Sequence, residues 1–81
     1  MTDNDGKMLL SVEITADGES VEIHGNQKGF DFLLDSIKRV SMHGNDHIHL
    51  LSREYGGEDL SDELIGQGNR KVGQVKVLFW S

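Results

Sequence analysis

The stretch VEIHGNQKGFDFLLDSIKRVSM, residues 21–42, changes from the pattern of a strand to the pattern of a helix. Val21 and Ile23 alternate with polar neighbours, as the side chains of a half-buried strand do. Asn26 then breaks the alternation, and its side chain can cap the first free N–H groups of a helix. Beyond it, apolar side chains recur every three or four residues, which predicts a helix over about 27–42 with the stripe Phe30, Leu33, Leu34, Ile37 and Val40.

A second strand pattern precedes this stretch. Apolar side chains alternate from Met8 to Ile14, and Asp17-Gly18 is a turn signal because glycine accepts the positive φ of a tight turn. The two strand patterns therefore predict an antiparallel hairpin. Residues 1–7 are polar, and we expect a flexible N-terminus without the apolar segment of a secretory signal.

Two more strand patterns follow the helix and are separated by a long loop. His47–Leu51 predicts a third strand, and residues 71–80 predict a fourth. Residues 52–70 between them are acidic and rich in glycine, which predicts a loop of a length that is often functional or disordered. The apolar residues that can anchor this loop are Leu60, Leu64 and Ile65.

The element order ββαββ predicts a single α+β domain over residues 8–81. Its simplest architecture is one mainly antiparallel four-stranded sheet with the helix packed on one face. Alternation assigns these side chains to the face beneath the helix: Met8, Leu10, Val12, Ile14, Val21, Ile23, Ile48, Leu50, Val75, Val77 and Phe79. It assigns these to an open face: Leu9, Ser11, Glu13, Glu22, His24, His47, His49, Leu51, Lys76, Leu78 and Trp80.

The last strand, Val75–Trp80, is apolar on both faces. If its other apolar side chains enter the core, Leu78 and Trp80 lie on the open face. Trp is favoured at protein contacts because it combines a large area with one N–H donor. The pattern therefore predicts contact with another protein at this face, and packing of Trp80 at the edge of the core is the alternative.

Composition excludes several classes of function. The chain has 81 residues, no cysteine and a formal net charge of −6. An acidic balance disfavours nucleic acids and anionic membranes, and no apolar run is long enough to span a bilayer. The absence of cysteine excludes disulfides and fits a cytoplasmic location. The charge suits a basic protein partner, although solubility alone also explains it.

Histidines give the best metal candidate, and we interpret it as no metal site. His47 and His49 lie on one strand face, where His24 or a glutamate can join them from a neighbouring strand. Zinc needs three or four such ligands, and two histidines in one strand arise easily by chance. We therefore expect half-exposed imidazoles that influence the binding of a partner.

The acidic loop offers no catalytic pair, because no apolar pocket is present to shift a carboxylate pKa. The sequence predicts neither an enzyme nor a cofactor. Ser11, Glu22 and His24 share a face, which we interpret as a coincidence of alternation. With only Arg53 to offset them, five carboxylates give the loop a local charge of about −4 that can steer a basic partner: Glu54, Glu58, Asp59, Asp62 and Glu63.

Several short segments together resemble a known bacterial pattern over roughly residues 20–80. They are VEIHGN at 21–26, GF at 29–30, DHIHL at 46–50, YGGEDLS at 55–61 and the closing VKVLFW at 75–80. In this order they resemble the immunity protein 32 family. The resemblance implies a small non-enzymatic protein that binds and neutralises a polymorphic toxin domain. The acidic residues add the inference that this domain is a basic nuclease.

The resemblance and the charge pattern together predict a partner-binding surface on the acidic loop and the open sheet face. Its expected residues are Trp80, Leu78, Tyr55, Glu54, Glu58, Asp59, His47 and His49. Two alternatives stay open. The first is a homodimer or larger homo-oligomer of structural or regulatory role, in which Leu51, Leu78 and Trp80 meet across a two-fold axis. The second, weaker alternative is a metal-dependent enzyme that uses His47 and His49.

Overall fold

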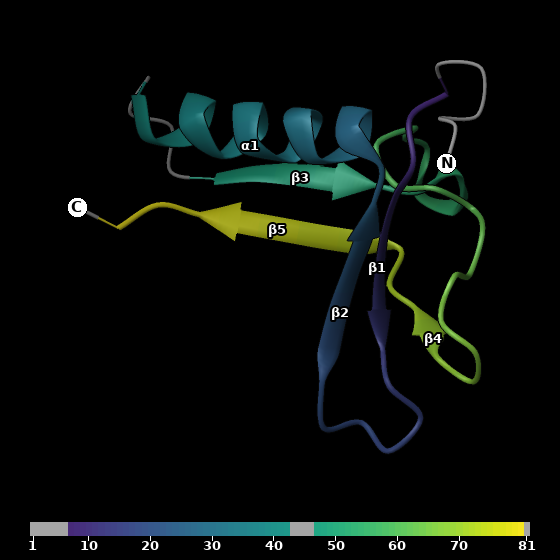
Figure 1. The fold of residues 1–81 in the computed structure, drawn as a ribbon. Helices are drawn as coiled ribbons and strands as arrows, with labels where there is room; N and C mark the ends of the chain where they lie inside the picture. Colours follow the sequence, from purple (N-terminus) through teal and green to yellow (C-terminus); the bar gives the residue numbers. More distant parts are fainter. Residues whose placement is uncertain (1–6, 43–46, 81) are drawn as a thin grey trace.

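A computed structural model describes residues 7–42 and 47–80 of the protein (Figure 1). The expected flexible segment 1–7 lies outside the described residues except for Lys7. The elements in chain order are β1 (Leu10–Ile14), β2 (Val21–Gly25), α1 (Gln27–Met42), β3 (His47–Leu51), the short 3-10 helix η1 (Arg53–Tyr55), β4 (Arg70–Lys71) and β5 (Gln74–Leu78).

The α+β class, the single helix and the antiparallel pairing are confirmed, but the strands form two sheets instead of one. One sheet has the order β2-β1-β4, and the other pairs β3 with β5. The expected last strand bends between its two halves. Val72 N donates to Val12 O of the first sheet, whereas Gly73 O accepts from Ser52 N beside the second. Each half of the strand therefore pairs with a different neighbour, and Figure 1 shows the β1–β2 hairpin projecting away from β5.

The helix begins where the sequence predicts because Asn26 caps it. Its Oδ1 accepts from Gly29 N at 2.9 Å and from Leu9 N at 3.1 Å, so one side chain closes the helix start and ties it to the chain before β1. Gly29 is required at this contact. A Cβ on Gly29 would overlap the Leu9 carbonyl group.

The helix buries only part of the expected stripe. Val40 is 2% exposed and Leu33 packs against the core, as expected. Ser36, outside the stripe, is however 1% exposed, and Gly29 is buried on the same side. These positions follow helical spacing, and two of them are small, so the helix approaches its neighbours closely along this line. Apolar residues of the expected stripe consequently turn outward, and their burial was predicted wrongly: Phe30, Leu34 and Ile37.

In the β1–β2 hairpin, the burial of several side chains is the opposite of what the sequence predicted. Val21 and Ile23 of β2 are 65% and 51% exposed, although alternation placed them beneath the helix. Ser11 and Glu13 of β1, expected on the open face, are fully buried. The reason is the 52–70 segment, which folds over that side of the hairpin. The residues of the hydrophobic cluster are Leu10, Val12, Leu50 and Leu60. Of the expected anchors of this segment, Leu60 is buried, whereas Leu64 and Ile65 are exposed.

Within the described ranges, no helix combines the length and apolar character needed to cross a bilayer.

Candidate functional site

The residues predicted to bind a partner lie at opposite ends of the β3–β5 sheet. Leu78 pairs with His47 at one end, and Leu51 pairs with Gln74 at the other. Trp80, beyond Leu78, is 84% exposed, and Leu78 is half exposed. This end therefore combines an apolar strand terminus with an exposed indole. The exposure predicted for the open face is therefore confirmed on β3 and β5, where His47, His49 and Lys76 are also exposed.

Tyr55 marks the other end. Its ring lies against Gly73, where a Cβ would be 2.9 Å from Tyr55 Cδ2. Glu54 and Glu58 are exposed nearby in the chain. Asp59 is instead half-buried and accepts a hydrogen bond from Leu51 N at 3.0 Å, so this carboxylate holds the loop against β3.

The acidic loop forms one wall of an open hollow of about 900 Å³. Arg53 lies 3.6 Å from Asp62 across this region, and Lys7 also lines it. Lys7 adds a cation that the loop count leaves out, and only three of the five loop carboxylates line the hollow, so the hollow is less acidic than the sequence count implies. The carboxylates that line it are Glu58, Asp62 and Glu63.

The histidines do not converge on one site. The rings of His47 and His49 meet edge to face with centroids 5.0 Å apart. His24 lies on β2, which belongs to the other sheet. Among the described residues, the group with metal-ligand spacing is Glu13, Glu22 and His24, whose ligand atoms lie within 4.8 Å of one another.

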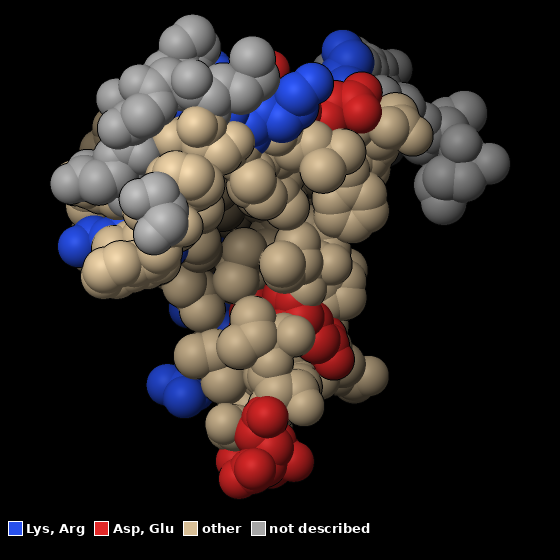
Figure 2. Space-filling model, turned by 90° about the vertical axis from the view of Figure 1, so that its left-hand side faces the viewer, with Lys and Arg blue, Asp and Glu red and all other residues tan. Residues whose placement is uncertain are grey.

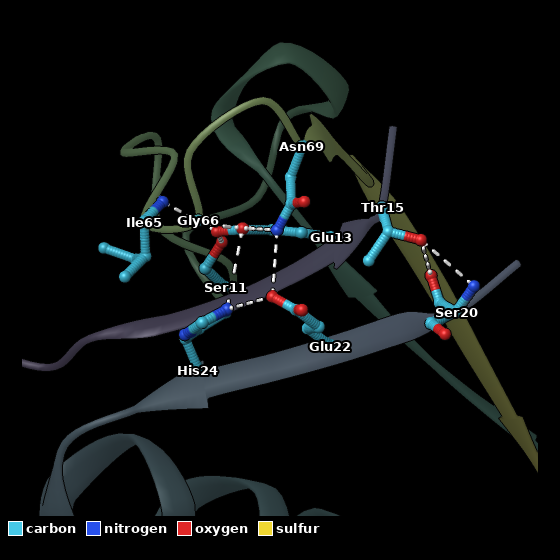
Figure 3. Close-up of polar contacts among 9 residues, drawn as sticks. All are labelled: Ser11, Glu13, Thr15, Ser20, Glu22, His24, Ile65, Gly66 and Asn69. Carbon is cyan, nitrogen blue, oxygen red and sulfur yellow. Dashed lines mark hydrogen bonds and ion pairs between the residues drawn. The ribbon is translucent and has the colours of Figure 1, made fainter. Parts of the chain in front are cut away.

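Glu13 lies at the centre of that group (Figure 3). Its side chain is fully buried. It accepts hydrogen bonds from Ser11 Oγ at 2.6 Å, Ile65 N at 2.8 Å, Gly66 N at 2.9 Å and Asn69 Nδ2 at 2.8 Å. Burial alone raises the pKa of Glu13, but these donors outweigh it and lower the pKa to about 2. The carboxylate is therefore ionised and satisfied by the protein itself.

Glu22 and His24 extend this cluster toward the surface. His24 Nε2 lies 2.9 Å from Glu22 Oε1, and this hydrogen bond is the largest cause that lowers the pKa of Glu22. Asn69 Nδ2 also donates to Glu22 Oε1 at 2.9 Å. The amide of Asn69 thus bridges the two carboxylates. It occupies the position between them that a shared cation would need. The cluster fits a fixed polar core better than a metal site.

Alternation correctly placed Ser11, Glu22 and His24 on one face, but their interpretation as a coincidence missed the cluster. The missing partners come from the loop more than 45 residues away in the chain. A usable signal was the glycine at Gly66, since a Cβ there would overlap the Asn69 amide and lie 2.9 Å from Glu13 Oε1. The loop backbone must therefore approach the carboxylate closely.

A second exposed surface was not predicted. We call it the helix–hairpin patch and define it as Val21, Ile23, Phe30, Leu34 and Ile37, all of which are exposed. The β2 part and the α1 part of the patch adjoin each other at Gly25, the last residue of β2. A Cβ on Gly25 would lie 3.1 Å from the Phe30 ring, so this ring packs beside the end of the strand. Figure 2 shows uncharged side chains over much of the hairpin and acidic groups gathered at its turn.

Comparison with known proteins gives no relative from which to transfer a function. No family of known proteins, no curated protein sequence and no solved structure matches the chain.

Proposed function

We propose that this protein is a non-enzymatic immunity protein that binds and neutralises a toxin domain, as its resemblance to the immunity protein 32 family implies. The observation that carries the proposal is the balance of apolar side chains. Among the described residues, five hydrophobic side chains are buried and eleven large ones are exposed. Five of the exposed side chains form the helix–hairpin patch, and contiguous exposed apolar patches mark protein contacts.

The helix–hairpin patch is the surface that this proposal favours. Phe30, Leu34 and Ile37 follow one another at helical spacing, which is the arrangement of anchors on a helix that docks with a partner. Val21 and Ile23 continue the apolar area along β2. A centre of this kind excludes water and concentrates binding energy in a few side chains.

Acidic residues lie at one end of this patch, at the hairpin turn, where Asp17 and Glu19 are exposed. On α1 the exposed Asp31 and Asp35 are offset by cations, and Arg39 lies 3.3 Å from Asp35. Together with the net charge of −6, the carboxylates of the turn favour a partner with a basic surface, such as a nuclease domain. Neutralisation then follows from occlusion of that basic surface.

The surface expected from the sequence supports the same function through different residues. It combines Leu78 and Trp80 with Tyr55, Glu54 and Glu58, which lie at the two ends of the β3–β5 sheet. A toxin domain that contacts both ends must span the whole sheet. The variants below distinguish this arrangement from binding at the helix–hairpin patch.

The cluster around Glu13 does not provide a catalytic base. Its buried carboxylate already accepts four hydrogen bonds from the protein, so no substrate proton has access to it.

We place the protein in the cytoplasm because a chain without cysteine suits a reducing compartment.

The proposal predicts that a toxin-like protein is encoded beside this gene, and co-expression of the two proteins tests it. We expect growth to be restored and a stable complex to be recovered. Leu34→Glu, at a side chain 60% exposed, should abolish protection without unfolding the domain. Leu64→Glu is the matched control, because Leu64 is exposed on the loop outside the patch.

Two outcomes distinguish an error in the contact surface from an error in the function. Loss of protection with Trp80→Ala but not with Leu34→Glu keeps the function and moves the contact to the surface expected from the sequence. Growth arrest by the toxin in the presence of the folded wild-type protein, with no complex, contradicts the function itself.

A further inference from the structure

The outer edge of β5 has no strand partner among the described residues. β5 pairs only with β3 there, and the bond from Ser52 N to Gly73 O fixes which residues face β3. In an antiparallel ladder these alternate, so Val75 and Val77 point their backbone groups toward β3. The N–H and C=O groups of Lys76 and Leu78 then point outward. An apolar edge of this kind is a template for another strand.

We propose that this edge pairs with β5 of a second copy of the chain, antiparallel about a two-fold axis at Leu78. The pairing joins two β3–β5 sheets into one four-stranded sheet in the order β3-β5-β5-β3. Figure 1 shows this end of β5 extending away from the hairpin, which leaves its edge accessible. The inference does not depend on the proposed binding of a toxin domain.

The sequence of the edge is complementary to itself in this register. Leu78 meets Leu78 of the second copy on the axis, and Lys76 lies opposite Trp80 of the second copy, where an ammonium can pack on an indole face. Val77 lies opposite Phe79 of the second copy on the other face. Every cross-strand pair from residue 76 to residue 80 is thus apolar or cation–aromatic, and about six backbone hydrogen bonds form.

Other registers lose this complementarity. An axis at Lys76 places two ammonium groups directly opposite each other, which destabilises a sheet. An axis at Val77 sets Lys76 against Leu78 of the second copy and leaves Trp80 opposite Gln74. The axis at Leu78 is therefore the register that the side chains favour.

Charge and area identify the partner as a second copy. Although the chain carries −6, neither β3 nor β5 contains a carboxylate, so the repulsion between copies lies away from this edge. Two copies of Leu78, Phe79 and Trp80 with the paired backbone bury roughly 1,000 Å² in total, the size of a weak, transient interface. A two-stranded sheet is also marginal alone, and two further strands stabilise it. We expect a dimer with a Kd on the order of 1–100 μM.

A charge exchange on the axis tests the proposal. Leu78 is half exposed, so Leu78→Glu and Leu78→Lys should keep the monomer fold, which circular dichroism checks. In each variant alone, two like charges meet on the axis, and analytical ultracentrifugation should find a monomer of 9.0 kDa at concentrations where the wild type dimerises. A one-to-one mixture of the two variants should recover the dimer mass.

The control is Leu64→Glu, which changes an exposed leucine of the 52–70 segment, outside β5, and should dimerise like the wild type. A wild-type protein that stays monomeric to about 1 mM overturns the proposal. A mixture of the two variants at position 78 that remains monomeric overturns the axis at Leu78. So does loss of the dimer in the control.

Discussion

Glu13 and Asn69 are 56 residues apart in the chain, and their side chains meet in a hydrogen bond of 2.8 Å. Glu13 lies on the central strand of the three-stranded sheet, and Asn69 directly precedes β4, the strand on its edge. The same Asn69 amide reaches Glu22 on the opposite neighbour, β2. One amide thus connects the loop to two strands, and the backbone amides of Ile65 and Gly66 complete the connection through Glu13.

We predict that Glu13→Gln destabilises the protein. Glutamine keeps the shape but replaces an acceptor oxygen with an NH₂ group that faces other donors, and it removes the charge they solvate. We expect the free energy of unfolding to fall by about 2–4 kcal/mol, measured with urea. Glu19→Gln, at the exposed hairpin turn, is the control and should change it by less than about 0.5 kcal/mol. Equal effects of the two substitutions contradict the role of Glu13.

The depressed pKa of Glu13 predicts a loss of stability in acid. Its pKa falls from 4.5 to about 2 on folding, so the unfolded chain binds the proton first as the pH drops. The stabilisation is complete above pH 4.5 and disappears as the pH falls from 4.5 to about 2. It amounts to about 3 kcal/mol.

Urea unfolding at a series of pH values measures this dependence. Glu22, whose pKa is also lowered, contributes in the same direction. The slope over this window should be smaller in Glu13→Gln than in the wild type, because the substituted side chain binds no proton. A slope that the substitution leaves unchanged assigns the acid sensitivity to other carboxylates.

Gly29→Ala tests the close approach of the helix. Alanine is the better helix former, so propensity alone predicts stabilisation of up to about 1 kcal/mol. The added Cβ instead overlaps the Leu9 carbonyl group, and the helix must move away from the strand. We expect a net loss of about 2 kcal/mol or more. Lys28→Ala, at the exposed neighbour, controls for propensity, and a Gly29→Ala variant as stable as this control contradicts the contact.

The sequence predicted elements well where local chemistry decides them. The Asn26 cap and the helical spacing gave the helix bounds 27–42, and alternation gave His47–Leu51 as the third strand. The face of the helix was not predictable in this way, because hydrophobic spacing ignores the small residues. Gly29 and Ser36 let the backbone approach, and this close packing outweighs the burial of larger side chains on the neighbouring stripe.

The same limit applies to the candidate sites: exposure set by the local pattern was predictable, whereas burial caused by residues far away in the chain was not. Alternation correctly predicted the exposure of Trp80 and Leu78, but it wrongly placed Phe79, which is 40% exposed, beneath the helix. Burial of Glu13 depended on donors from Ile65 and Gly66, more than 50 residues away, and no local pattern reports such a contact. A glutamate on a strand looks solvent-facing in sequence, whatever segment later covers it.

Trp80 reports on self-association because it is the only tryptophan in the chain. At 84% exposure it should emit like indole in water when the protein is dilute. If β5 pairs across the two-fold axis, its ring packs against Lys76 of the second copy, and the emission should shift to shorter wavelength as the concentration rises. The shift should be absent in Leu78→Glu at every concentration.

Trp80→Ala completes this prediction with a separate readout. An exposed side chain contributes little to folding, so the free energy of unfolding of the monomer should change by less than about 0.5 kcal/mol. The dimer Kd should rise about tenfold or more, because the substitution removes two aromatic contacts from one interface. Sedimentation equilibrium measures the Kd, and urea unfolding at low concentration measures the monomer. A large loss of monomer stability with an unchanged Kd assigns Trp80 to the core of its own chain.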